Sequence, residues 1–277
     1  ENSSLREVIA GVKKTAPKAL FQLNHPRAAD PLDVDLAFFD HLSVGQPYDP
    51  LQSLSSVNNE SLLSTDPVSG FRDIDFDVIE VLNGAEFAVY HQIRDDWFSL
   101  LNQGARRAAT GNSDSHGLRS VVAAPRNYVY LPGAGKLPLD EHLLTDAVRS
   151  GRSFMTTGPL LAVTLRSDRE DVGLGGQFRG GRGELHVQID AAPWVPVSKL
   201  TVWVNGKIYR QLKASAGDHK VVDLIADGDA YVVVEVEGEP GPVYRALMPD
   251  LAPIALTNPI YIDADGDGKR RAPTPMN

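Results

Sequence analysis

In the first half of the chain, short apolar runs typical of strands alternate with segments whose apolar residues recur at helical spacing. Short apolar or β-branched runs predict strands at residues 19–23, 76–84, 106–113 and 127–132. Apolar side chains at helical spacing predict helices at residues 4–14, 86–103 and 138–151. Ser4 and Glu7 form a capping-box pattern for the first helix, Gly104 ends the second, and Pro138 and Gly151 bound the third. This alternation favours an α/β layer or barrel with parallel strands.

After Gly158 the pattern changes to a period of two. Alternating β-branched runs predict strands at residues 160–167, 183–192, 199–213, 219–226 and 230–238. Because no helical pattern lies between them, they favour an antiparallel β-sandwich. Asn205-Gly206 predicts a tight hairpin turn, with Val202, Val204 and Ile208 directed inward. We therefore expect an α/β part at residues 1–157 and a β-sandwich domain at 158–277.

One long segment, residues 30–71, shows neither period. It is rich in Pro, Asp, Ser and Asn, which predicts an irregular surface loop.

Composition limits the partners and the metal ligands. A net charge of −9 argues against nucleic acid as a partner, because binding to phosphate relies on clustered Lys and Arg. No apolar run is long enough to predict a membrane-spanning helix. With 0 cysteines, any transition-metal site must use His, Asp and Glu. The composition is compatible with either the bacterial cytoplasm or a secreted or periplasmic location.

Two short motifs follow predicted strands and carry metal-binding residue types. His25 comes just after the run at 19–23, and Asp114 and His116 come just after the run at 106–113. Loops after the carboxyl ends of parallel strands gather on one face, so these side chains are expected to converge on a divalent metal such as Zn, Mn or Fe. The alternatives are a buried histidine bonded to a carbonyl for His25, and ordinary loop residues for the Asp-x-His pair.

In order and spacing, "LNHPR", "DVIEVLNG" and "TGNSDSHG" resemble motifs of the PHP (polymerase and histidinol phosphatase) metallohydrolases, in the carbaryl-hydrolase-like branch. The segment "SGRSFMTTGPLL" and the tail ending "TNPIYIDADGDG" are similar to a C-terminal extension in that branch. The resemblance implies the C-terminal part of a distorted βα barrel that holds two or three metal ions, followed by the β-sandwich. It implies His25, Asp114 and His116 as metal ligands.

The resemblance also implies roles for three further residues. Glu80 and Asn83 would lie near the pocket, and Arg27 would hold an anionic or carbonyl group of the substrate. Simpler alternatives are a pairing of Glu80 with a neighbouring Lys or Arg, and a structural ion pair for Arg27.

The sequence departs from the family pattern before His25. The family's His-x-His motif does not occur there, so either the remaining ligands come from another segment or chain, or this chain is inactive alone. The implied function is hydrolysis of a small-molecule phosphoester, carboxylic ester or carbamic ester by metal-activated water. The competing interpretation is a non-catalytic β-sandwich that binds glycan, protein or calcium on a barrel remnant.

A third motif, "DADGDG", lies near the C-terminus. Asp263, Asp265 and Asp267 followed by Gly268 match the start of a calcium-binding loop. The twelfth position is Thr274 rather than Glu, which argues against an EF-hand. A calcium loop and a plain acidic turn are both compatible with this motif.

Overall fold

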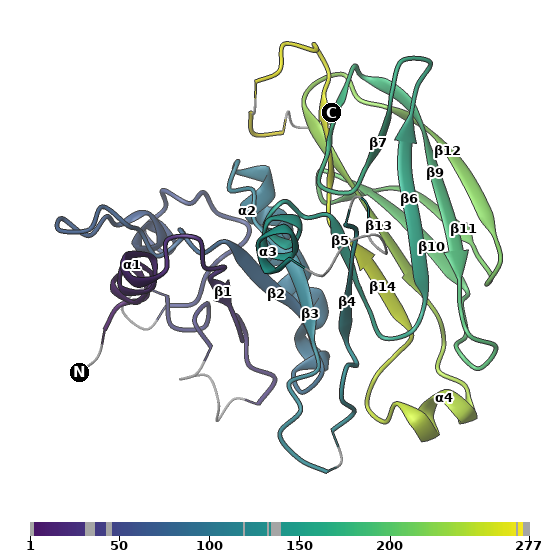
Figure 1. Ribbon diagram of the computed structural model, residues 1–277, viewed down its shortest axis with the longest axis horizontal. Coiled ribbons are helices and arrows are strands. Elements are labelled where there is room, and N and C mark those ends of the chain that lie inside the picture. The colour runs from purple at the N-terminus through teal and green to yellow at the C-terminus, as the bar shows by residue number, and fades with distance from the viewer. Residues whose placement is uncertain are drawn as a thin grey trace.

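The chain folds into three β-sheets with a small helical content (Figure 1). The computed structural model describes residues 3–30, 37–42, 46–118, 120–131, 133, 140–269 and 271–273. Over these ranges the sheets have three, eight and four strands, and none of them closes into a barrel. The expected mixed α/β chain with sandwich-like sheets is therefore present. In the same ranges no helix has the length and apolar character needed to cross a membrane.

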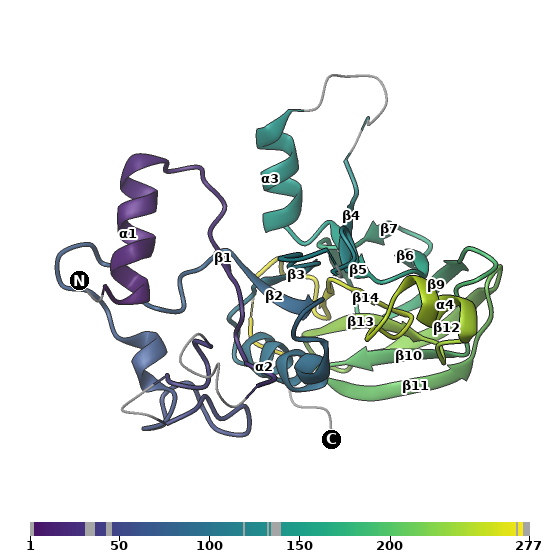
Figure 2. The ribbon, with the colours of Figure 1, turned by 90° about the horizontal axis from the view of Figure 1, so that it is seen from below.

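The three-stranded sheet is parallel, with the order β1-β2-β3. Its strands are β1 (Gln22–Leu23), β2 (Val78–Asn83) and β3 (Ala108–Asn112). α1 (Leu5–Thr15) precedes this sheet and begins at the predicted capping box of Ser4 and Glu7. A 3-10 turn, η3 (Phe87–Val89), leads into α2 (Tyr90–Asn102), which follows β2. In Figure 2, α2 and α3 (Glu141–Arg149) lie on opposite sides of β2 and β3.

The strands β4 (Arg126–Val129) and β5 (Ser153–Thr156) depart from the predicted parallel arrangement. They pair antiparallel and belong to the eight-stranded sheet, so that sheet begins well before residue 158. α3 connects them, and the side chain of Asp140 caps its first turn. Pro138, expected at the start of this helix, lies outside the described residues.

Two sheets make up the sandwich. The larger has the order β11-β10-β13-β14-β5-β4, with β15 beside both β13 and β8, and the smaller has the order β12-β9-β6-β7. The remaining elements are β6 (Leu160–Arg166), β7 (Asp171–Gly173), β8 (Gln177–Arg179), β9 (Arg182–Asp190), β10 (Lys199–Val204), β11 (Lys207–Lys213), β12 (His219–Ile225), β13 (Ala230–Glu237), α4 (Pro242–Leu247), β14 (Ile254–Thr257) and β15 (Ile260–Asp263).

β13 joins the two hydrophobic cores. Val232, Val234 and Val236 pack inside the sandwich, whereas Tyr231 and Val233 pack in the core that contains α2. A strand buried on both faces has no polar face, which explains its nearly continuous run of Val and Tyr.

The prediction of an irregular surface loop at 30–71 holds only in part for the described residues, because the backbone is irregular and many side chains are exposed but several are buried. Phe39 and Leu62 are fully buried, and Tyr48 is 2% exposed. Their side chains belong to the core that also contains Ile93 and Trp97 of α2. The described part of the segment therefore has an irregular backbone whose buried side chains complete one side of the core. It includes the 3-10 turn η2 (Glu60–Leu63).

The hairpin at Asn205-Gly206 is confirmed, because both residues have positive φ, 52° and 73°. Val202 and Val204 point inward as predicted, but Ile208 is 55% exposed. The two-residue turn pairs Val204 with Lys207 and Trp203 with Ile208, so Ile208 shares the face of Trp203 and not that of Val202 and Val204.

Candidate functional site

His25 and His116 both contact the carboxylate of Asp114. The Nε2 atom of His116 lies 2.7 Å from Oδ1, and the Nε2 atom of His25 lies 3.7 Å from Oδ2. The three residues follow the carboxyl ends of β1 and β3, as predicted. His25 and Asp114 have positive φ angles of 48° and 47°, an uncommon conformation for residues other than glycine.

Glu80 forms the buried floor of this site. Its side chain is 1% exposed, and its Oε2 atom accepts hydrogen bonds from the His25 backbone N–H and from Asn83 Nδ2, each at 3.0 Å. Its Oε1 atom accepts from Asn112 Nδ2 at 2.8 Å. No ion pair joins Glu80 to a Lys or Arg in the described ranges, which disfavours the structural alternative for this residue. Asn112 belongs to the "TGNSDSHG" motif, and its bond to Glu80 fits a role in supporting the residues that would bind the metal.

Asn83 links the floor to the Asp-x-His loop. Its Nδ2 atom also reaches Asp114 Oδ2 at 3.4 Å, while its Oδ1 atom accepts the backbone N–H groups of Ala85 and Glu86. The next residue, Gly84, lies so close to this loop that a Cβ atom there would be 2.5 Å from the carbonyl oxygen of Ser113. These contacts hold the end of β2 tightly against the segment that carries Asp114.

The donor set consists of imidazole nitrogens and carboxylate oxygens, which suits Zn, Mn or Fe. Both histidines meet Asp114, but the three side chains do not place one donor atom each within 4.8 Å of the others. Over the described residues, only Asp229, Asp263 and Asp265 meet that criterion. Of the three side chains predicted to converge, each histidine therefore contacts Asp114, but the three do not form a closed set of ligands.

Arg27 is buried, and its interactions favour the structural alternative to a substrate-binding role. It is 2% exposed and forms a bidentate pair with Asp96 at 2.8 and 3.0 Å. Its remaining N–H groups bond to Asp40 and to the carbonyl oxygens of Phe39 and Tyr48. All five guanidinium N–H donors are thus used inside the chain, and none is left for a substrate.

The acidic motif near the C-terminus forms a second cluster of possible cation ligands. Asp263 and Asp229 are 1% and 8% exposed, and each places a carboxylate oxygen within 4.8 Å of one on Asp265. Asp267 lies outside this group and pairs with Arg271, which lowers the pKa of Asp267 to about 2. Sequence reasoning missed Asp229, whose proximity follows only from the pairing of β13 with β15.

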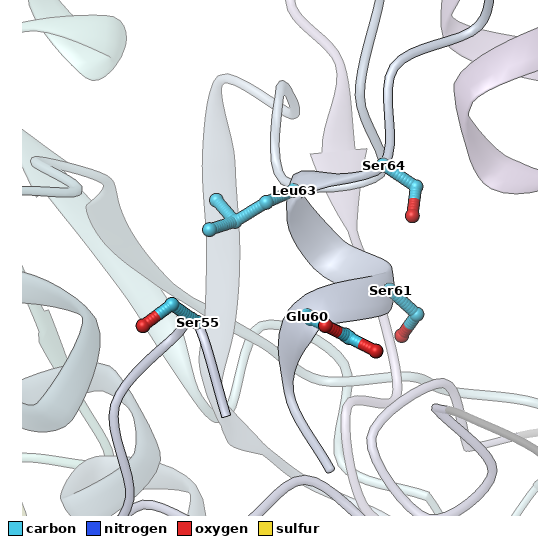
Figure 3. Close-up of a pocket in the computed structure, with 5 residues that line it drawn as sticks. All are labelled: Ser55, Glu60, Ser61, Leu63 and Ser64. Carbon is cyan, nitrogen blue, oxygen red and sulfur yellow. The ribbon is translucent and has the colours of Figure 1, made fainter. Parts of the chain in front are cut away.

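Four pockets of the described chain are lined by residues other than the predicted site residues. A pocket of about 490 Å³ is lined by Ser55, Glu60, Ser61, Leu63 and Ser64, with Glu60 as its one ionisable side chain (Figure 3). A larger cleft of about 1250 Å³ lies near the start of β3, and residues of β4–β8 line much of it. The His25–Asp114–His116 cluster instead follows the opposite, carboxyl end of β3.

Comparison with known proteins gives little guidance. No family model and no curated protein matches the chain. A crystal structure of the CARDB domain of a Pyrococcus furiosus protein, in complex with di-metal ions, is 17% identical with a TM-score of 0.23, covering 39% of this chain and 96% of that chain. A solution structure of the same domain is 14% identical with a TM-score of 0.23, covering 38% and 95%. Likeness at this level carries no argument about fold or function.

Proposed function

We propose that this chain contributes a divalent-metal site to a PHP-type metal-dependent hydrolase of phosphoester, carboxylic ester or carbamic ester bonds. The observation that carries the proposal is the contact of two imidazoles with one carboxylate, directly beside the buried Glu80. When bound, a divalent metal supplies Lewis acidity and lowers the pKa of a water molecule.

The residues present fit a cation. Burial of a carboxylate without a partner of opposite charge is costly, and the described residues around Glu80 supply only neutral N–H donors. A cation held by His25, Asp114 and His116 would offset the charge of Glu80 through space. The positive φ angles of His25 and Asp114 fit the same proposal, because strained backbone is retained where it positions functional side chains.

The chain's own residues then have distinct tasks. Asp114 holds its two oxygens toward two different imidazoles, and Asn83 orients it by a hydrogen bond to Oδ2. Glu80 fixes the backbone of His25, and Asn112 in turn fixes Glu80. His116, with 82% of its side chain exposed, is the ligand with the greatest freedom to move toward a metal.

The test begins with Mn²⁺ and Zn²⁺ binding to the metal-free 277-residue chain, measured by calorimetry. We expect weak Zn²⁺ binding that Asp114→Asn abolishes and that Asp168→Asn, in the exposed turn after β6, leaves unchanged. Hydrolysis of 4-nitrophenyl phosphate and 4-nitrophenyl acetate is then measured on the chain and on the longest natural form of the protein. We expect little turnover by the chain alone and Asp114-dependent turnover by a form that supplies the remaining ligands. Zn²⁺ binding or turnover that survives Asp114→Asn refutes the proposal.

A second candidate function is a binding module for acidic glycans, favoured by the cleft of about 1250 Å³. Tyr128, Phe154 and Arg152 line it, and the Nε atom of Arg152 is buried without a hydrogen-bond partner among the described residues. Aromatic rings stack on sugars, and a guanidinium binds a carboxylate. Glucuronate is therefore expected to bind, glucose is not, and Arg152→Met is expected to abolish the difference. Equal affinity for the two sugars would exclude this function.

A further inference from the structure

The geometry points to a calcium site at the end of the β13–β15 ladder, with Asp229, Asp263 and Asp265 as its carboxylate ligands. One oxygen from each of these side chains lies within 4.8 Å of the other two. This ligand set differs from that of the sequence motif, because Asp229 takes the place of Asp267. The inference does not depend on the proposed hydrolase function.

Strand pairing explains why Asp229 belongs to the site. β13 and β15 are antiparallel, with Ala230 opposite Ile262, so one step further places Asp229 opposite Asp263. Like charges directly opposite one another destabilise a sheet. Since both aspartates are nearly fully buried, their repulsion is poorly screened by water. A divalent cation between them turns this repulsion into attraction.

Asp263 provides an independent sign of a ligand. Its Oδ2 atom accepts hydrogen bonds from the backbone N–H of Gly268 at 2.8 Å and from Gln177 Nε2 at 3.2 Å. Its Oδ1 atom is buried and accepts no hydrogen bond from the described chain. The side chain is thus a buried carboxylate with one oxygen available to a cation.

Arg271 covers the outer side of this cluster but does not reach Asp263. Its Nη1 atom lies 3.4 Å from oxygens of both Asp229 and Asp265, and its main partner is Asp267. Arg271 is therefore a competing cation for the two outer ligands. With 42% of its side chain exposed, it can withdraw toward water when calcium binds.

Calcium is favoured over Zn²⁺, Cu²⁺ or Fe²⁺ because every ligand is a carboxylate oxygen and none is an imidazole or a thiolate. Magnesium demands a smaller, near-octahedral set of oxygens and gives up its waters reluctantly, so we expect it to bind more weakly. With three carboxylates and a competing arginine, affinity on the order of 0.1–1 mM is expected, as in extracellular calcium modules.

The test is titration of the metal-free 277-residue chain with CaCl₂ and with MgCl₂, followed by calorimetry. We expect one calcium ion to bind per chain. Asp229→Asn and Asp263→Asn should each bind calcium at least about tenfold more weakly than the wild type, and Asp168→Asn should bind it equally well. Asp267→Asn should weaken binding less than Asp229→Asn does, and Arg271→Gln should tighten it. If Asp263→Asn fails to fold, the Asp229 and Arg271 variants carry the test.

Three outcomes overturn the inference: no saturable calcium binding by the wild-type chain, unchanged binding in Asp229→Asn, or a larger loss in Asp267→Asn than in Asp229→Asn. His25→Ala separates this site from the hydrolase site, because it should remove Zn²⁺ binding and leave calcium binding intact. Loss of calcium binding in His25→Ala would also refute the assignment.

Discussion

The side chain of Asn258 pairs with the backbone of Ala109 as a neighbouring strand would. Its Oδ1 atom accepts the Ala109 N–H at 2.7 Å, and its Nδ2 atom donates to the Ala109 carbonyl oxygen at 2.9 Å. Asn127 does the same for Gly111, at 2.9 and 2.7 Å. Two asparagine side chains thus satisfy the outer edge of β3, which joins the parallel sheet to the sandwich without a direct strand ladder.

Asn258→Ala should therefore destabilise the fold by about 3 kcal/mol, because it leaves a buried N–H and a buried carbonyl of Ala109 unpaired. Unfolding in urea measures this loss. Asn102→Ala is the matched control, since Asn102 is exposed and donates a single hydrogen bond, to the Asn205 carbonyl oxygen. Equal stability of the two variants would contradict the role assigned to Asn258.

Local signals predicted well wherever they depend on few neighbouring residues. The capping box at Ser4, the turn at Asn205-Gly206 and the end of the second helix next to Gly104 all occur as predicted. Asn258 and Asp229 show the limit, because their roles depend on which strands become neighbours and a linear sequence does not state that pairing. The same limit applies to the candidate site. The positions of His25 and Asp114 after strands were predictable from local sequence, whereas the burial of Arg27 depends on partners distant in the sequence, such as Asp96.

A buried ion pair fixes α2 against β13. Arg94 Nη1 contacts both carboxylate oxygens of Glu235 at 3.1 and 3.0 Å, and Tyr90 and Trp203 also donate hydrogen bonds to that carboxylate. Arg94→Met should cost about 3–5 kcal/mol of unfolding free energy, because Glu235, at 1% exposure, loses its counter-charge. The double variant Arg94→Met, Glu235→Leu should recover much of that loss. A double-mutant cycle in urea tests this, and simple additivity would show that the two residues are not coupled.

Asp96 should make stability depend on pH. Burial raises its pKa to about 6 against the opposing effect of Arg27, whereas an unfolded Asp titrates near pH ~4. The folded state then binds the proton more tightly, so this group's contribution to the unfolding free energy falls as pH rises from about 4 to 6. We expect Asp96 to make the chain about 1 kcal/mol more stable at pH 5 than at pH 7, and Asp96→Asn to lose this difference. Identical pH slopes for wild type and variant would refute the raised pKa.

Alanine substitutions at Gly206 and Gly217 separate the cost of a left-handed backbone conformation from the cost of crowding a neighbouring side chain. Both have left-handed φ angles, 73° and 88°, but a Cβ at Gly206 would lie 3.1 Å from the Phe98 Cβ, whereas one at Gly217 meets nothing within 4 Å. Gly217→Ala should cost only the backbone term of about 1–2 kcal/mol, and Gly206→Ala about 1 kcal/mol more. Thermal unfolding of the two variants gives the comparison. Equal losses of stability in the two variants would mean that Phe98 moves aside at no cost in free energy.

Metal should stabilise the chain through His25 without being needed for folding. His25 keeps 36% of its side chain exposed and its ring contacts the partly exposed Asp114, so His25→Ala should leave the Tm of the metal-free chain nearly unchanged. Saturating Zn²⁺ binds only the folded state and should raise the wild-type Tm by a few degrees. The variant should lack this rise, and His142→Ala, an exposed histidine of α3, should retain it. A metal-induced rise that persists in His25→Ala would place the bound ion elsewhere on the protein, and a large fall in the metal-free Tm would make His25 a structural residue instead.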